Sequence, residues 1–518
     1  MTDDEHDLDD RPGDPVVVET WLDAPARSYA RRPATVLDVL DRAVRRFPDR
    51  TAFVDGAIAL TYPAFADRVE TAAASLRSHG LVAGDAVAVA SGNTLDLATL
   101  LFACARADLV MVGLNTRLAP SQWAYMVEHS LVRLSLAAPG FELTGALDLA
   151  TFLTASPPVP WAFSAADRPD EASTYAVVYT SGTTGRPKAS QVVHRASVHS
   201  GMSYQRVLQL GPDDVTAVLF PMYYISAMHA HVLPAMLAGA SCVLLDTQSP
   251  RDYVELLRTR AVTWAYAVPS WWRLCLRVPG FGDLPALTRL AAGGAPFPAD
   301  LVTALRAALP GVRLLDVYGL SETHSPGCIL TDDCFATHPG SVGRTLDCMA
   351  ATVRADDGAV LGPGEPGELW LRGSLVTTGY RHDPAATAAA IVDGWFDTGD
   401  IARMSADGFV TILDRSKDMI NRGGSKIFSA EVEELLRRHP SIEDAAVVGV
   451  PDPLAGEAVA AYLVVSAPVT TAEVRAWVRE GMADYAAPKI IQVVDALPRN
   501  AVGKTDKPAL RARHAQPR

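Results

Sequence analysis

The chain has 518 residues, of which 49% are hydrophobic and 20% are charged, and its formal net charge is -13. This length exceeds what one hydrophobic core usually serves, and the composition is globular, so fibrous and disordered classes are excluded and at least two domains are expected. The acidic balance argues against a nucleic-acid partner held on a basic surface.

The start of the chain, residues 1–20, is predicted to be a disordered acidic tail, because acids crowd together in MTDDEHDLDDRPGDP without aromatic residues. No basic segment followed by an apolar one opens the sequence, so export is not signalled. The six cysteines show neither a CxxC pair nor zinc-finger spacing, which is typical of free thiols in a reducing compartment. We therefore expect a cytoplasmic protein.

Helices and strands are predicted to alternate after this tail. Residues 36–47 and 65–81 have the apolar spacing of amphipathic helices, and the runs 86–91 and 109–114 are typical of buried parallel strands. The most apolar stretch, residues 215–245, contains two prolines, two histidines and a glycine, which disfavours a membrane helix. The pattern predicts an α/β architecture without a membrane span.

The predicted secondary-structure pattern changes at two points further along the chain. Residues 351–379 place turn residues between short alternating strands, which predicts a β-rich subdomain. After Asp414 the order helix, strand, strand, helix predicts a compact α+β unit. We expect an N-terminal domain over residues 21–414, made of two layered α/β subdomains and the β-rich one, and a small mobile α+β domain over residues 415–518.

A glycine loop, YTSGTTGRPK at residues 179–188, combines two glycines, four Ser or Thr hydroxyls and two cations. Backbone N–H groups and side chains of this kind can wrap a polyphosphate. The loop is not the GxxxxGK[ST] pattern, so a P-loop enzyme is disfavoured. Taken alone, such a turn is a plain connector about half the time, and the loop does not decide the function.

Further motifs decide it, because they follow the loop in a recognisable order. The sequence closely resembles the adenylate-forming superfamily of acyl-CoA synthetases, beetle luciferases and nonribosomal peptide synthetase adenylation domains, and most of all its acyl-CoA synthetases. The resemblance extends from about Thr35 to about Leu510. Besides the loop, it rests on AAGGAPFP (291–298), VYGLSET (317–323), GELWLRG (367–373), GWFDTGD (394–400), DRSKDMINRGGSKI (414–427), VGVPDPLAGE (448–457) and LPRNAVGKTDK (497–507).

The resemblance implies an enzyme that joins a carboxylic acid to coenzyme A through an acyl-AMP intermediate, using ATP and Mg²⁺. It implies catalytic roles for Lys504, Glu322 and Thr183, with Glu322 as the metal ligand. Tyr318 would stack on adenine, and Asp400 and Arg415 would bind the ribose diol. The implied nucleotide site comprises Thr180, Ser181, Gly182, Thr183, Thr184, Gly185, Lys188, Gly293, Gly294, Ala295, Pro296, Asp316, Val317, Tyr318, Gly319, Ser321, Asp400, Ile412, Arg415 and Lys504.

The acyl and coenzyme A sites follow by the same resemblance. Lys417 is the implied hinge about which the small domain rotates between the two half-reactions. An aromatic acyl pocket fits a bulky apolar acid better than acetate. Tyr223, Tyr224, Met228, Trp271 and Trp272 are expected to shape this pocket or the core beside it, and His229 and Gly319 are further pocket candidates. The expected residues of the coenzyme A site are Gly423, Gly424 and Ser425. For His194, His229 and His231 we favour plain hydrogen-bonded core roles over that of a base.

Several positions depart from the family pattern. Ala189 and Ala227 stand where glycine is usual, and a methyl group added near nucleotide or acyl group costs about 1–3 kcal/mol at a tightly packed backbone. GGSKI replaces the usual GGENI or GGEKI, and Ser429 stands where many relatives have proline. The adenylation half-reaction is therefore in doubt.

Alternatives to a complete acyl-CoA ligase stay open. One is a variant that only thioesterifies preformed acyl-AMP supplied by a partner adenylating enzyme. A second is a stand-alone adenylation enzyme that loads a carrier protein, although no carrier-like DSL serine motif follows Lys504. A luciferase-like oxygenase is possible on fold alone. A noncatalytic binding protein would be expected to lose Lys504, Glu322 or Asp400, and all three are present.

Overall fold

The computed structural model describes residues 15–154, 161–164, 167–180, 187–246, 249–423, 425–499 and 505–515. The chain divides into two compact units, one made of residues 1–351 and 370–397 and the other of residues 352–369 and 398–518. The domain boundary predicted at residues 414/415 therefore falls inside the second unit. Among the described helices, none combines the length and apolar character that crossing a bilayer requires.

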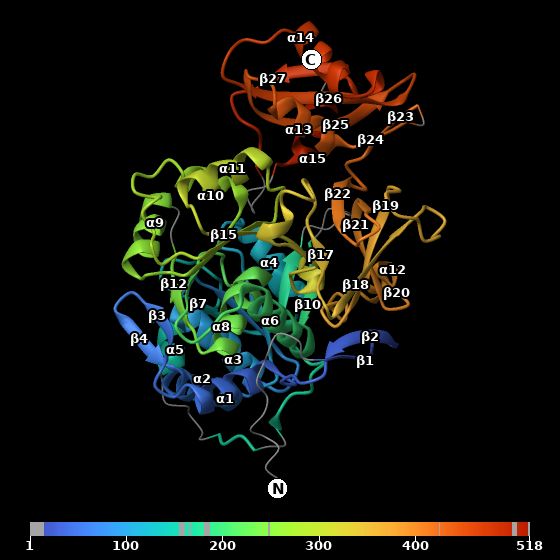
Figure 1. Ribbon diagram of the computed structural model, residues 1–518. Coiled ribbons are helices and arrows are strands. Elements are labelled where there is room, and N and C mark those ends of the chain that lie inside the picture. The colour runs from blue at the N-terminus through green and yellow to red at the C-terminus, as the bar shows by residue number, and fades with distance from the viewer. Residues whose placement is uncertain are drawn as a thin grey trace. The chain divides into compact units, whose positions relative to one another are not determined.

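The first unit contains a six-stranded sheet with the order β10-β9-β6-β5-β7-β8 (Figure 1). Neighbouring strands run parallel except β9 and β10, which form an antiparallel pair. The strands are β5 (Ala86–Ala90), β6 (Val110–Gly113), β7 (Val132–Ala137), β8 (Leu147–Asp148), β9 (Thr174–Thr180) and β10 (Lys188–Val193). The strands predicted from the apolar runs 86–91 and 109–114 are confirmed, because both are buried along their whole length.

A nine-stranded sheet in the same unit has the order β17-β16-β15-β14-β13-β11-β12-β3-β4. The central strands β15, β14, β13, β11, β12 and β3 run parallel, so their carboxyl ends meet at one edge. The strands are β3 (Thr51–Asp55), β4 (Ile58–Thr61), β11 (Val215–Val218), β12 (Ser241–Leu244), β13 (Trp264–Ala267), β14 (Arg289–Gly293), β15 (Arg313–Tyr318), β16 (Cys328–Leu330) and β17 (Arg344–Thr345).

Helices cover these sheets. The helices predicted at residues 36–47 and 65–81 are confirmed as α1 and α2, and α1 begins with a capping box between Thr35 and Asp38. Helices α9, α10 and α11 pack on one side of the nine-stranded sheet around a shared apolar core. The helices of this unit are α1 (Val36–Arg46), α2 (Tyr62–Ser78), α3 (Leu95–Arg106), α4 (Pro120–His129), α5 (Leu149–Thr154), α6 (His194–Leu208), α7 (Ile225–Ala227), η3 (Met228–Val232), α8 (Leu233–Ala238), α9 (Pro250–Thr259), α10 (Pro269–Cys275), α11 (Ala299–Ala308), η4 (Ser321–Thr323), η5 (Asp332–Cys334) and α12 (Pro384–Ala390).

The disorder predicted over residues 1–20 does not extend to the end of that range. Residues 1–14 lie outside the described residues, but β1 (Val16–Trp21) pairs antiparallel with β2 (Ala24–Tyr29), so the prediction of disorder is wrong for residues 16–20. The run VVVETW is rich in β-branched residues, which favour strands. Trp21 anchors the pair, because its ring is buried and its Nε1 donates to the carbonyl oxygen of Val376 at 3.1 Å.

The β-rich region predicted over residues 351–379 is confirmed as part of a five-stranded sheet with the order β18-β19-β21-β20 and β22 beside β21. The boundaries between the two units fall within β18, β19 and β21. The strands are β18 (Met349–Arg354), β19 (Gly367–Gly373), β20 (Ile391–Val392), β21 (Trp395–Met404) and β22 (Val410–Arg415).

The last part of the second unit is the predicted α+β fold. Its sheet has the order β24-β23-β26-β25 with β27 beside β26, and α13 and α14 pack on a separate apolar core. The elements are β23 (Ile420–Arg422), β24 (Ser425–Ile427), α13 (Ser429–Arg437), β25 (Ile442–Asp452), β26 (Gly456–Val465), α14 (Thr471–Gly481), η6 (Asp484–Ala486), β27 (Ile490–Val493) and α15 (Lys507–Ala515).

Candidate active site

The two glycines of AAGGAPFP lie at the carboxyl end of β14, where ligands commonly bind in parallel sheets. A side chain at Gly293 would meet the hydroxyl of Tyr266 and the carbonyl oxygen of Val317. Gly294 has a φ of +76°, which favours glycine. The exposed loop that follows, through Ala295 and Pro296, therefore begins with a backbone that a ligand can approach closely.

Tyr318 ends the neighbouring strand β15, and Gly319 follows it beside Ser325. Asp316 and Tyr318 are two residues apart on this strand and share one of its faces. Asp316 is buried, and burial raises the pKa of its carboxyl to about 8, against a hydrogen bond with the backbone of Val317 that lowers it. Asp316 therefore holds its proton at neutral pH.

Glu322 lies in η4, just after β15, and is 7% exposed. Its Oε1 accepts a hydrogen bond from the hydroxyl of Thr180 at 3.2 Å and another from the hydroxyl of Tyr380 at 3.0 Å. The Nζ atom of Lys188 lies 4.9 Å from the centre of the Tyr380 ring. The structure thus brings three predicted residues, Thr180, Lys188 and Glu322, together around Tyr380. Burial, and next the Glu322 carboxylate, raises the pKa of the Tyr380 hydroxyl, which stays a donor.

The side chains around Glu322 limit how a magnesium ion could be held. Among the described residues, no three His, Cys, Asp or Glu side chains form a cluster that could hold a metal by themselves. Glu322 offers one hard carboxylate, and Mg²⁺ in proteins commonly takes one or two carboxylates, with substrate phosphates and water completing its shell. The residues present therefore fit a magnesium ion that arrives with a nucleotide.

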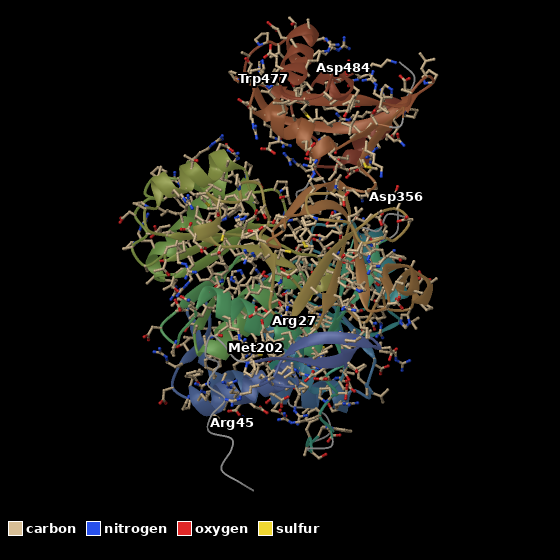
Figure 2. All side chains as sticks on the ribbon, turned by 45° about the vertical axis from the view of Figure 1, so that its right-hand side comes forward. Arg27, Arg45, Met202, Asp356, Trp477 and Asp484 are labelled. Atoms are coloured by element: carbon tan, nitrogen blue, oxygen red, sulfur yellow. The ribbon has the colours of Figure 1, made fainter. Side chains whose placement is uncertain are left out.

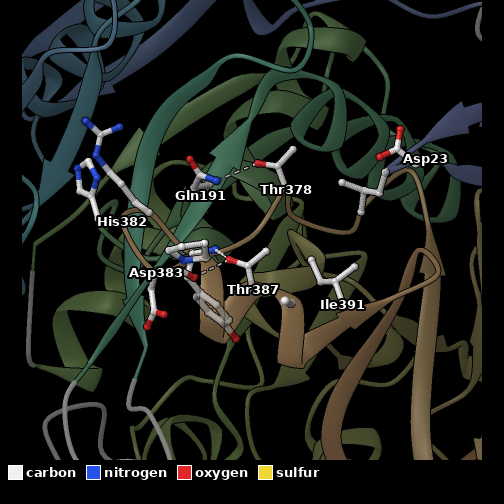
Figure 3. Close-up of a pocket in the computed structure, with 12 residues that line it drawn as sticks. Asp23, Gln191, Thr378, His382, Asp383, Thr387 and Ile391 are labelled. Carbon is white, nitrogen blue, oxygen red and sulfur yellow. Dashed lines mark hydrogen bonds between the residues drawn. The ribbon is translucent and has the colours of Figure 1, made fainter.

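A cleft of about 470 Å³ lies beside Tyr380. Figure 3 shows its lining, in which Gln191 donates to the hydroxyl of Thr378 at 3.2 Å and the hydroxyl of Thr387 accepts from the backbone N–H of Tyr380 at 2.9 Å. These bonds fix the backbone on which Tyr380 stands. The cleft residues therefore orient the tyrosine that holds Glu322.

The glycine loop, which is predicted to bind phosphate, joins two paired strands. Thr180 at the end of β9 lies opposite Lys188 at the start of β10, so both ends of the loop are fixed. The other predicted loop residues, Ser181, Gly182, Thr183, Thr184 and Gly185, lie outside the described residues, as do Lys504 and Gly424. The nearest described residues before and after Lys504 are Arg499 and Thr505. Arg499 donates to the hydroxyl of Thr505 at 3.2 Å and to the carboxylate of Asp444 at 2.7 Å.

Asp400 and Arg415 lie opposite each other on β21 and β22. The Nε of Arg415 lies 2.7 Å from Oδ1 of Asp400, and the carboxylate is 3% exposed while the arginine is 43% exposed. Ile412 lies on β22 and pairs with Ala402. The pair predicted to bind one diol is therefore adjacent, with its cation facing solvent.

The hinge and coenzyme A positions lie in the same unit. Lys417 follows β22, and its carbonyl oxygen accepts a bond from Arg511 at 3.3 Å. Gly423, with a φ of +60°, makes the turn between β23 and β24, and Ser425 begins β24. Their roles toward coenzyme A stay predictions.

The methyl group of Ala189 packs into an apolar core. Successive side chains of a strand point to opposite faces, and while Lys188 lies over Tyr380, Ala189 packs into the apolar core of the six-stranded sheet and is fully buried. Ala227 is also fully buried, in α7. The Ala189 methyl therefore points to the face of β10 opposite to Lys188, and its effect on nucleotide binding stays a prediction.

The predicted acyl residues fall into two groups. Tyr223, Tyr224, Met228 and His229 line one cavity of about 20 Å³, in the company of residues from β6 and β9. Trp271 lies elsewhere, on α10, where its ring centre is 5.9 Å from that of Tyr253. A cavity of this size holds about one water molecule, so an acyl group would have to move its lining side chains.

The three histidines have the core roles that we favoured. His194, His229 and His231 are fully buried, and burial lowers their pKa values to about 3, 4 and 3. His229 bonds through Nδ1 to the carbonyl oxygen of Ile225 and through Nε2 to Ser197, and His231 bonds to Thr216. They are neutral hydrogen-bonded residues at physiological pH.

The sequence matches a known family of proteins over most of its length. Residues 40–381 match the family described as AMP-binding enzyme, and residues 431–504 match the AMP-binding enzyme C-terminal domain. The chain belongs to this family. It is 33% identical over 483 residues to a feruloyl-CoA synthase of an Amycolatopsis species, with 91% of this chain and 97% of the relative covered. It is likewise 33% identical to a 2-succinylbenzoate–CoA ligase of Bacillus licheniformis, covering 88% and 95%.

Solved structures agree with the sequence relatives. An o-succinylbenzoate CoA synthetase from Bacillus subtilis, solved with an acyl-adenylate intermediate, has a TM-score of 0.83 and 27% identity, covering 93% of this chain and 98% of that one. The same enzyme has been solved with ATP and a magnesium ion, with a TM-score of 0.83, 28% identity and coverage of 92% and 98%. The predicted fold, two layered α/β subdomains with a β-rich one and a small α+β domain, is confirmed.

Tyr380 was not predicted as a site residue. Tyr380 lies in GYRHDPAAT, which begins six positions after the last residue of the GELWLRG motif, yet nothing in its spacing assigns it a role. Only the fold brings its hydroxyl to Glu322 and its ring to Lys188. A tyrosine placed among glycine and polar turn residues was the one available signal.

Proposed function

We propose that the protein is an AMP-forming acyl-CoA ligase that converts a carboxylic acid to its coenzyme A thioester through an acyl adenylate. The observation that carries the proposal is the arrangement around Tyr380. The buried carboxylate of Glu322 contacts Thr180 at one end of the glycine loop and Tyr380, and the cation of Lys188, at the other end of the loop, lies over the Tyr380 ring. The relatives named as CoA ligases and the neighbour with a bound acyl adenylate support it.

In the first half-reaction the acid's carboxylate attacks the α-phosphorus of ATP and pyrophosphate leaves. Lys188 and the loop hydroxyls would bind the β- and γ-phosphates through charge-assisted bonds. A magnesium ion would be held by Glu322 and would offset phosphate charge. Lys504 would stabilise the negative charge that grows at the α-phosphate. Tyr318 and the Gly293–Gly294 backbone would bind adenine, and Asp400 with Arg415 the ribose diol.

In the second half-reaction the thiol of coenzyme A attacks the mixed anhydride and AMP leaves. The two steps need different groups at one site, so the chain after Lys417 would rotate between them. Gly423, Gly424 and Ser425 would then approach the pantetheine chain. We place the enzyme in the cytoplasm, in keeping with its six free cysteines, five of which are buried.

The complete reaction is favoured over the variant that needs a partner adenylating enzyme. Doubt about adenylation rested mainly on Ala189, and the packing of its methyl group into the core of the six-stranded sheet, on the face opposite to Lys188, supports this preference. As substrate we propose a bulky, largely apolar acid, because Tyr223, Tyr224 and Met228 surround the small cavity. The names of the relatives put aromatic acids first among those to test.

The test uses two mixtures with the purified protein alone. One contains ATP, magnesium, coenzyme A and a panel of acids, and the other contains synthetic acyl adenylates and coenzyme A. Acyl-CoA in both, detected by mass spectrometry, is expected. Product only from adenylates would establish the thioesterifying variant, and product in neither would reject the CoA-ligase function.

A further inference from the structure

The first residue of α13, Ser429, makes two hydrogen bonds at a buried position. Its backbone N–H donates to Oδ2 of Asp414, which lies at the end of β22. The first N–H groups of a helix have no partner within the helix, and a carboxylate is the acceptor that this end favours. Ser429 is fully buried and Asp414 is 5% exposed, so this bond is shielded from water.

The side chain of Ser429 extends the cluster. Its hydroxyl accepts from Nζ of Lys507 at 2.6 Å, and the same Nζ lies 2.9 Å from Oε1 of Glu433. Lys507 and Glu433 are 14% and 11% exposed. Lys507 is the first residue of α15, three positions after Lys504. The cluster therefore joins β22, the start of α13 and the helix that follows the loop of Lys504.

Further contacts accompany these bonds. Phe428 packs against Ile401 and Leu413, which belong to β21 and β22. Lys426 lies 3.2 Å from the carboxylate of Asp356, a residue labelled in Figure 2. The apolar contact has no directional preference, whereas the bonds of Ser429 require one alignment of α13 with β22.

The implied hinge, Lys417, separates the partners of this cluster. Asp414 precedes it, while Ser429, Glu433 and Lys507 follow it, so rotation about Lys417 must break the bond between Ser429 and Asp414. Arg511, in α15, contacts the residue that follows the hinge, since its Nη2 lies 2.7 Å from Oδ1 of Asp418. We propose that Asp414, Ser429 and Lys507 form a latch that stabilises one of the two domain orientations used by the two half-reactions; this inference rests on the proposed function.

Ser429 is the residue that makes the latch. Proline at this position would lack the N–H and the hydroxyl, and it suits the first position of a helix. Phe428, with φ -85° and ψ 111°, has the extended backbone that a following proline requires. Ser429→Pro should therefore fold while removing both bonds, and Ser429→Ala should remove only the bond from Lys507. Thr471→Pro, at the first position of α14, is the matched control.

The first measurement compares the half-reactions in each variant, by ATP–pyrophosphate exchange and by acyl-CoA formation from a synthetic acyl adenylate. Loss of two buried bonds to charged partners changes an orientation equilibrium by about tenfold or more. In Ser429→Pro the two rates should move in opposite directions and their ratio should change by about tenfold, with a smaller change in Ser429→Ala and none in Thr471→Pro. An equal loss of both rates would mean a purely structural role and would overturn the latch.

The second measurement does not need activity. Trypsin cleaves after Arg415, two residues before the hinge, and after the hinge residue Lys417, and fragments are quantified by mass spectrometry. Cleavage there should be about tenfold faster in Ser429→Pro than in the wild type or Thr471→Pro. Unchanged cleavage would overturn the proposal. If the wild type makes no acyl-CoA, the proposed function fails, and the cleavage rates still decide whether the latch exists.

Discussion

Asp316→Asn tests the electrostatics of the strand that carries Tyr318. Burial raises the pKa of Asp316 from 3.8 to about 8, so between these values the folded protein binds a proton that the unfolded chain releases. Stability contributed by this group therefore falls as pH rises from about 4 to about 8. At pH 7 the cost is about 4 kcal/mol as an upper figure, at about 1.4 kcal/mol per pH unit above the unfolded value.

Asparagine mimics the protonated acid, since it offers a donor and an acceptor of similar shape but cannot ionise. We expect Asp316→Asn to unfold at higher urea concentration than the wild type at pH 8 and at the same concentration near pH 4. The assay follows tryptophan fluorescence during urea unfolding from pH 4 to 8, with Asp283→Asn as an exposed control. A stability difference that stays constant with pH, or a variant less stable at pH 8, would refute the reasoning.

Three further predictions concern the first half-reaction. Tyr380→Phe removes one of the two hydrogen bonds to Glu322. It should lower the rate of ATP–pyrophosphate exchange about tenfold and raise the magnesium concentration needed for half-maximal exchange, without changing acyl-CoA formation from adenylates. An unchanged magnesium dependence would contradict this prediction. Ala189→Gly should lower the free energy of unfolding by about 1 kcal/mol and leave the KM for ATP within about twofold; a marked fall in KM would show that the methyl does impede ATP. Lys504→Ala should lower exchange at least about a hundredfold while sparing the thioester step, measured from synthetic adenylates; equal loss of both steps would argue against its role.

Part of the site could be predicted from the sequence because motif order places residues at strand ends. Asp400 and Arg415 are 15 positions apart in the sequence, and the β21–β22 pairing makes them neighbours, as predicted. Thr180, Lys188 and Glu322 converge for the same reason. Here local motifs and global topology agree.

Other features depended on tertiary structure. The direction of Ala189 follows from strand alternation, but only once Lys188 is known to start β10. The sequence pattern around Trp271, which stands beside Trp272, does not indicate that Trp271 packs against Tyr253 and does not line the small cavity. The acidic composition of the first residues hid the strand-forming run VVVETW beside them. The bonds of Ser429 join residues 15 and 78 positions away, which spacing does not reveal.

The central claim is that this chain alone activates an acid with ATP and transfers it to coenzyme A. The most direct test is acyl-CoA formation by the purified protein from ATP, magnesium, coenzyme A and a panel of bulky aromatic and aliphatic acids, followed by mass spectrometry. We expect acyl-CoA together with AMP and pyrophosphate in equal amounts. Failure to form acyl-CoA from any acid, when synthetic acyl adenylates are converted under the same conditions, would contradict it.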